Sequence, residues 1–275
     1  MEVVRQVEVP SAVISYRRAG RGPAVLLVQG VGVIGEGWRP QIDGLADRYT
    51  TISFDNRGIG ASALREAKPT IEDMARDALA ILDAEKVDRV HLVGHSMGGV
   101  IAQEIALRAR DRIKSLAFLC TFARGKQGAV PGLGMMVTGL RTRLGTAAMR
   151  RNAFLEIVMP PALLAARDRA QIAEELRPLF GRDLAEQPRI VMKQLSAMSK
   201  YDATARLAEL AGIPTLVVAG ALDRVARSAF GRQLAAAIPG ARFVELPGAA
   251  HGVPIHDAAT INRLLSEHFA SAETS

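Results

Sequence analysis

Cysteine is almost absent from this sequence: Cys120 is the only one among 275 residues. A single thiol cannot form a disulfide within the chain or supply a cluster of thiolate ligands to a metal ion. Cys120 directly follows the apolar run Ser115–Leu119. We therefore interpret it as a small buried hydrophobe and not as a nucleophile.

Aromatic residues are also scarce, at 4% of the chain, although the net charge is +7. The arginines are spread along the chain without interleaved aromatic residues, so nucleic acid is the least favoured partner. The densest basic group contains Arg141, Arg143, Arg150 and Arg151. It is best interpreted as a solvated helical face, and attraction of an acidic substrate is the second interpretation.

No apolar run is long enough to span a membrane, and Met1–Gln6 lacks a basic region followed by an apolar one. We therefore expect a cytoplasmic protein without a membrane partner. The composition, 49% hydrophobic and 23% charged, fits one large α/β domain that carries an insertion. The oligomeric state is left open.

What the sequence does contain is a G-x-S-x-G motif at residues 94–98. The apolar run Val90–Val93 precedes the motif, and a helical pattern over Gly99–Leu107 follows it. Small residues on both sides of Ser96 allow a sharp turn that exposes its hydroxyl at the positive end of the next helix. This pattern predicts that Ser96 is a nucleophile.

A serine nucleophile needs a base and a third group that orients the base. Asp223 follows the strand pattern Ile213–Gly220, and His251 lies in a small-residue loop after the strand pattern Arg242–Leu246. In a fold with this strand, serine turn and helix, the partners follow in the chain order Ser, then Asp or Glu, then His. We predict Asp223 as the acid and His251 as the base.

His256 is the main competitor for the role of base, because it lies only five residues after His251. It directly precedes Asp257, where a helix is predicted to begin, and a role at the helix entry suits it better. A metal site built from His251, His256 and Asp257 lacks a helical i, i+4 pair of histidines and a third clear ligand. No metal and no cofactor are predicted.

Acyl transfer also requires N–H donors for the developing oxyanion. One is expected from Met97, the residue after the nucleophile. The other is expected from Val31, in the glycine-flanked loop Gln29–Gly32 that follows the strand pattern Ala24–Val28.

Together these motifs make the chain resemble the α/β-hydrolase superfamily from about Val13 to the C-terminal helix. Residues 54–62 are similar to the family's D-x-R-G-x-G-x-S turn, and residues 94–99 to its nucleophile elbow. Many relatives have histidine where Gln29 stands, which affects the loop conformation but not a backbone donor. Serine at position 96 argues against haloalkane dehalogenases and epoxide hydrolases, which attack through a carboxylate.

The predicted fold class is α/β: a mostly parallel central sheet flanked by helices, with an inserted helical cap. Early strands are expected over 3–9, 12–18, 51–54 and 87–93, and helices over 38–47 and 71–85. Residues 1–124 and 206–275 are assigned to the hydrolase core. Residues 125–205, methionine-rich and punctuated by prolines, are assigned to the cap.

The cap and its surroundings are predicted to bind the substrate, because thioethers fill irregular apolar space. The candidate substrate-binding residues are Gly30, Trp38, Met135, Met136, Met149 and Met159. Residues 102–108 resemble enol-lactonase-like hydrolases, which implies a small carboxylic ester or lactone as substrate. A C–C bond hydrolase, a cofactor-free perhydrolase and a slowly turning ligand sensor with the same triad remain alternatives.

Overall fold

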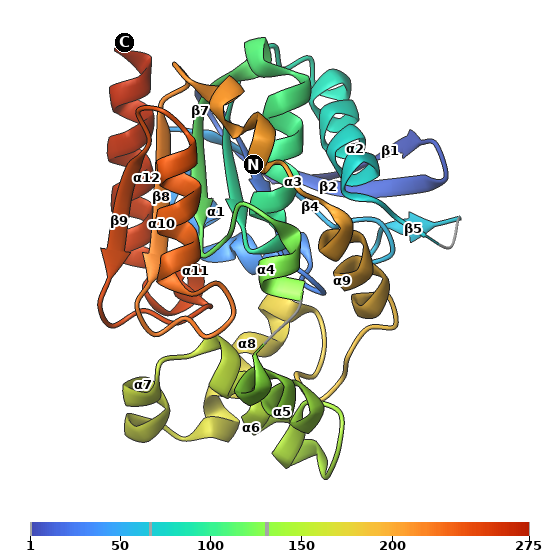
Figure 1. Cartoon of the computed structure of the whole chain (residues 1–275). Coiled ribbons are helices and arrows are strands. Elements are labelled where there is room, and N and C mark those ends of the chain that lie inside the picture. Colours follow the sequence, from blue (N-terminus) through green and yellow to red (C-terminus); the bar gives the residue numbers. More distant parts are fainter. Residues whose placement is uncertain (1, 66–67, 130–131, 275) are drawn as a thin grey trace.

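The central element of the fold is a nine-stranded sheet, seen in a computed structural model that describes residues 2–65, 68–129 and 132–274 (Figure 1). The strand order is β1-β2-β4-β3-β6-β7-β8-β9, and β5 pairs with β2. The strands are β1 Val3–Val9, β2 Ala12–Gly20, β3 Ala24–Val28, β4 Thr50–Phe54, β5 Ala63–Leu64, β6 Val90–His95, β7 Ile113–Leu119, β8 Thr215–Gly220 and β9 Arg242–Leu246.

The sheet is parallel from β4 to β9, whereas β1, β2 and β5 pair in antiparallel fashion. Every residue of β4, β6 and β8 is buried. Complete burial requires cover on both faces of the sheet, which is the usual environment of parallel strands. The predicted fold class is therefore confirmed.

Helices supply this cover. The α-helices are α1 Arg39–Leu45, α2 Ile71–Ala84, α3 Met97–Arg108, α4 Gly125–Ala129, α5 Leu133–Arg141, α6 Ala147–Val158, α7 Pro161–Ala166, α8 Arg169–Phe180, α9 Val191–Lys200, α10 Ser228–Ala237, α11 Val253–His256 and α12 Ala258–Glu273. Short 3₁₀ helices are η1 Gly35–Trp38, η2 Arg110–Arg112 and η3 Thr204–Leu210. Helix α1 packs against α12, and α2 packs against α3.

The helix predicted over residues 38–47 is shorter in the structure, where α1 spans Arg39–Leu45 and Trp38 ends the preceding 3₁₀ helix η1. Pro40 occupies the first turn of α1, where its missing N–H costs no hydrogen bond. Trp38, the last residue of η1, is fully buried and makes an edge-on ring contact with His95. Thr70 caps the N-terminus of α2 and forms a reciprocal capping box with Asp73.

Helices α4 to α9 lie between β7 and β8 in the chain, and α5 to α8 form a layer of their own away from the sheet (Figure 1). This layer has a hydrophobic cluster of its own, which includes Leu155, Ile172, Leu176 and Phe180. Helix α9 instead contributes Met198 to the main core. The division into a core and a cap at residues 125 and 205 stays a prediction.

No helix in the described ranges has both the length and the apolar composition needed to cross a membrane.

Candidate active site

Ser96 occupies a strained turn between β6 and α3. Its backbone angles, φ +56° and ψ −122°, are rarely adopted by residues other than glycine. The neighbouring glycines make the turn possible: a Cβ at Gly98 would lie 2.0 Å from the carbonyl oxygen of Val28. The Ser96 N–H donates to Leu119 O, and Ser96 O accepts from the Thr121 hydroxyl. The turn is thus fixed on both sides.

Ser96, His251 and Asp223 form a continuous hydrogen-bonded row. Ser96 Oγ lies 3.0 Å from His251 Nε2, and His251 Nδ1 lies 2.8 Å from Asp223 Oδ2. The three residues come from the turn after β6, the loop after β9 and the loop after β8. Because these strands are parallel, their carboxyl ends meet at one edge of the sheet. The arrangement can deprotonate the serine hydroxyl through the imidazole.

Asp223 is held as an anion by its surroundings. Its Oδ1 accepts hydrogen bonds from the amides of Val225 and Ala226, at 2.7 and 2.8 Å. Burial alone would raise the pKa of this carboxyl group, but the His251 ring and the two amides outweigh burial and hold the pKa below its ordinary value. An ionised Asp223 keeps the proton of a neutral His251 on Nδ1, which leaves Nε2 free to accept one.

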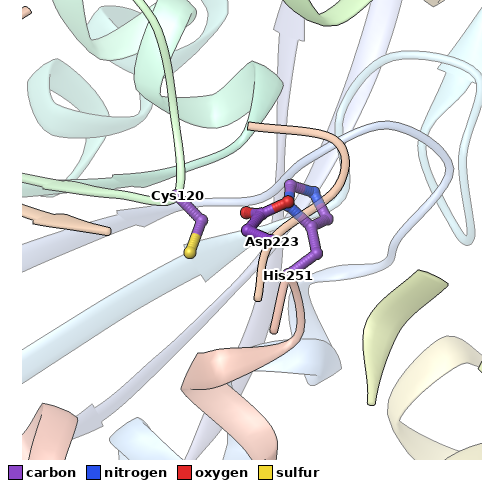
Figure 2. A group of neighbouring side chains, drawn as sticks. All are labelled: Cys120, Asp223 and His251. Atoms are coloured by element: carbon purple, nitrogen blue, oxygen red, sulfur yellow. The ribbon is translucent and has the colours of Figure 1, made fainter. Parts of the chain in front are cut away.

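Cys120 lies beside the Asp223–His251 pair (Figure 2), and ligand atoms of the three residues lie within 4.8 Å of one another. Burial, together with the charge of Asp223, raises the pKa of the Cys120 thiol. Metal ligation and nucleophilic attack both require a thiolate. The thiol is therefore held protonated, and His251 Nδ1 and Asp223 Oδ2 are already hydrogen-bonded to each other at 2.8 Å.

Two further histidines approach the site. His95 lines the same cavity as Ser96, its Nε2–H donates to His251 O at 2.8 Å, and burial lowers its pKa to about 3. His256 accepts a hydrogen bond from the amide of Ala250, next to His251. Both rings therefore hold the loop that carries His251, and neither hydrogen-bonds to Ser96 Oγ.

The loop after β3 lies against Ser96. A Cβ at Gly30 would lie 3.1 Å from Ser96 Cβ, so a larger residue at this position would crowd the nucleophile. Among the described residues, the N–H groups of Val31 and Met97 have no protein acceptor. Two free amides beside the nucleophile are what an oxyanion site requires.

Gly32 is bound by two side chains from the segment between β7 and β8 that contains α4 to α9. Its N–H donates to Gln194 Oε1 at 2.9 Å, and its carbonyl oxygen accepts from Arg182 Nη1 at 2.6 Å. Gly32 has φ +68°, in the left-handed region. We call Gln194 and Arg182 the Gly32 clamp. Nothing in the local sequence indicates these contacts, which join residues 162 and 150 positions apart.

A cavity of about 570 Å³ opens above Ser96. Three of the predicted substrate-binding residues line it: Gly30, Met135 and Met136. The other three lie elsewhere. Trp38 is buried in the core, Met149 is 56% exposed on the surface, and Met159 is buried in the cluster of α5 to α8. Trp38, Met149 and Met159 therefore do not border the cavity above Ser96.

Sequence reasoning missed much of the cavity wall. The apolar additions include Phe154, Ile157, Phe180 and Leu195, and the polar ones include Arg143, Arg182 and Gln187. The two phenylalanines also make an edge-on ring contact with each other. Phe154 lies in α6 and Phe180 ends α8, and no local sequence pattern tells which residues of these helices border a cavity.

Comparisons with known proteins agree with this geometry. A family model described as the alpha/beta hydrolase fold matches residues 23–258. RutD of Azorhizobium caulinodans, named as a carbamate hydrolase, is 31% identical over 91% of this chain and 92% of its own length. An enol-lactonase from Burkholderia xenovorans has a TM-score of 0.80 at 25% identity, covering 97% of this chain and all of its own. A hydrolase from Pseudomonas aeruginosa has a TM-score of 0.80 at 28% identity, over 96% and 97%.

Proposed function

The chain belongs to the α/β-hydrolase fold family, and from this premise we propose that it is a serine hydrolase that cleaves a small carboxylic ester or lactone through an acyl-enzyme on Ser96. The observation that carries the proposal is the row of hydrogen bonds from Ser96 Oγ through His251 to Asp223, at 3.0 and 2.8 Å. These contacts join the nucleophile to a base and the base to an orienting anion, beneath a cavity of substrate size.

In the first half-reaction, Ser96 Oγ attacks the carbonyl carbon while His251 Nε2 takes the hydroxyl proton. The carbonyl π electrons move to oxygen, and the amides of Val31 and Met97 donate hydrogen bonds to the resulting oxyanion. When the tetrahedral intermediate collapses, the carbon–oxygen bond to the leaving alcohol breaks. The leaving oxygen takes the proton from His251, and the acyl group remains on Ser96.

In the second half-reaction, water replaces the alcohol. His251 Nε2 takes a proton from water as the water oxygen attacks the acyl carbon. Collapse of the second intermediate breaks the bond to Ser96 Oγ, which recovers its proton from His251. The carboxylic acid leaves, and the site returns to its starting state. Asp223 stays ionised throughout and stabilises the imidazolium that forms in each half.

The choice of an ester or lactone is supported by the apolar cavity and by the enol-lactonase among the structural relatives. The RutD relative is named for carbamate hydrolysis, which uses the same attack on a carbonyl carbon. An ester, a lactone and a carbamate differ in the leaving group, and the row of three side chains serves all of them. We propose a small-molecule substrate and a cytoplasmic location.

A panel of p-nitrophenyl esters of increasing acyl length tests the proposal. We expect many turnovers per Ser96 with at least one ester, and a loss on the order of 10⁴-fold or more in kcat for Ser96→Ala. Retention of more than a few per cent of the activity in pure, folded Ser96→Ala would refute the assignment. Formation of less than one product per site would favour a ligand sensor over an enzyme.

A further inference from the structure

Arg182, in the segment between α8 and α9, is a rigidly held cation in the wall of the active-site cavity. Its Nε donates to Glu186 O at 3.0 Å, and its Nη1 donates to Gly32 O and Phe180 O at 2.6 and 3.1 Å. The guanidinium carbon also lies 5.8 Å from the centre of the Phe180 ring. These contacts fix the plane of the guanidinium, and among the described residues Nη2 has no hydrogen-bond acceptor.

The positive charge of Arg182 has no carboxylate partner in the part of the chain that the structure describes. Its three acceptors are backbone carbonyls, which satisfy N–H groups but carry no net charge. Burial lowers the pKa of Arg182 to about 10, an effect that Glu186 partly opposes. The group is therefore still charged at neutral pH, and its half-buried guanidinium makes no ion pair with a described carboxylate.

The rest of the cavity wall does not neutralise this charge. The described lining residues include no aspartate or glutamate, although the whole chain has 28 acidic residues. A second guanidinium, that of Arg143, lies at the exposed rim, where Nη2 approaches Met192 Sδ at 2.9 Å and makes no ion pair with a described carboxylate. The cavity is thus apolar with two positive groups, a combination that attracts an anion.

The position of Arg182 relative to Ser96 suits one substrate that reaches both. Arg182 binds Gly32, and Gly30 lies against Ser96. Three consecutive residues place their outer Cα atoms at most roughly 7 Å apart. The guanidinium therefore lies within the reach of a short substrate whose carbonyl group is held at Ser96.

We propose that this cavity selects substrates that carry a carboxylate in addition to the scissile ester or lactone group, and that Arg182 Nη2 donates a hydrogen bond to that carboxylate. The inference rests on the proposed function, because it names the substrate class of the same site. The three backbone carbonyls engage only Nε and Nη1 of Arg182, so Nη2 is the donor that remains for the carboxylate.

The test compares esters that match in shape but differ in charge. One pair carries the charge on the acyl side: the p-nitrophenyl monoester of adipic acid and p-nitrophenyl 6-methylheptanoate. The other pair carries it on the leaving group: 4-carboxyphenyl and 4-isopropylphenyl butanoate. For wild-type protein we expect the charged member of at least one pair to have the higher kcat/KM, and Arg182→Met to lower that ratio by about tenfold or more.

Two control variants separate charge from structure. Arg177→Met removes an exposed cation of α8 that does not line the cavity, and it should leave the ratio unchanged. Gln194→Met breaks the other half of the Gly32 clamp, and it should slow both members of a pair equally. Preference of the wild type for the neutral member in both pairs, or an equal loss for both members in Arg182→Met, would overturn the inference.

A binding measurement keeps the inference separate from the proposed function. Calorimetry with adipate, and with 1,6-hexanediol as the neutral counterpart, requires no turnover. If wild type hydrolyses no ester but binds adipate in an Arg182-dependent way, the hydrolase assignment fails and the anion site stands. If wild type hydrolyses the neutral esters and adipate neither binds nor inhibits, the hydrolase assignment stands and the anion site fails.

Discussion

At the scale of single residues, the site distinguishes one nucleophile and one base from close competitors. Cys120 lies beside Asp223, but the raised pKa of its thiol keeps it protonated. His95 lines the same cavity, but burial keeps it neutral and its Nε2–H is committed to a backbone carbonyl. Ser96 and His251 differ from both because their reactive atoms face each other.

The two histidines of the last loop give a matched prediction. His251→Ala should lower kcat by roughly 10⁴-fold or more, because no other histidine in the described part of the chain hydrogen-bonds to Ser96 Oγ. His256→Ala should keep activity within about tenfold and mainly lower stability, because its ring contacts the backbone amide and carbonyl of Ala250 and not Ser96. Turnover at equal folded concentration checks both. The reverse ranking would show that the base is His256.

At the scale of elements, the sequence predicts the strands that carry the site, because a chemically distinctive residue follows each of them. The strand patterns before Ser96, Asp223 and His251 were enough to predict that these residues meet at one edge of a parallel sheet. For residues 125–205 the sequence predicts helices but not how those helices pack. Whether Met149 or Met192 borders the cavity depends on how α5 to α9 pack, and no local pattern fixes that packing. The Gly32 clamp is a long-range contact for the same reason.

The Gly32 clamp predicts that α9 contributes to the chemical step. Gln194→Met removes the acceptor of the Gly32 N–H but keeps a side chain of similar volume. The neighbouring Val31 amide should then lose its fixed direction. We expect kcat to fall by about tenfold with a much smaller change in KM, since the oxyanion forms only in the transition state. Leu195→Met, a cavity-lining change on the same helix, is the control. An unchanged kcat in folded Gln194→Met would show that the clamp is purely structural.

The methionines of the helical segment should differ in their effect on substrate choice. Met198 lines the cavity, whereas Met149 is exposed and packs beside Gly145. Met198→Ala enlarges the pocket, so it should shift the optimum toward longer acyl chains by about 1–3 kcal/mol in relative kcat/KM. Met149→Ala should keep the wild-type profile. If both variants had the same acyl-chain-length profile, Met198 on α9 would not contribute to the substrate pocket.

At the scale of the whole molecule, buried neutral histidines make the fold sensitive to mild acid. Burial lowers the pKa of His91 to about 4, although Glu273 opposes the shift, and it lowers the pKa of His95 to about 3. The ordinary value of 6.5 applies to the unfolded chain. Between these values the unfolded chain binds protons that the folded chain excludes, so stability rises with pH there and falls as pH drops below 6.5.

Each of these two histidines should therefore lower the free energy of unfolding by roughly 2 kcal/mol as the pH falls from 6.5 to 5. Urea unfolding at pH 7.5 and at pH 5.0 measures the total loss. His91→Asn should show a smaller loss than wild type, whatever its stability at pH 7.5. Carboxyl groups with lowered pKa values, such as Asp183 at about 2, act only at more acidic pH. An equal free energy of unfolding at both pH values would contradict this account.

The central claim, that Ser96 is the nucleophile, is tested most directly by covalent labelling with a fluorophosphonate. Such a probe transfers its phosphonyl group to an activated serine with loss of fluoride. Intact-mass and peptide mass spectrometry of the full chain should show one adduct per molecule, located on Ser96, with loss of esterase activity in proportion. Ser96→Ala and His251→Ala should remain unlabelled. An adduct on any other residue, Cys120 included, or full activity after complete labelling of Ser96, would contradict the claim.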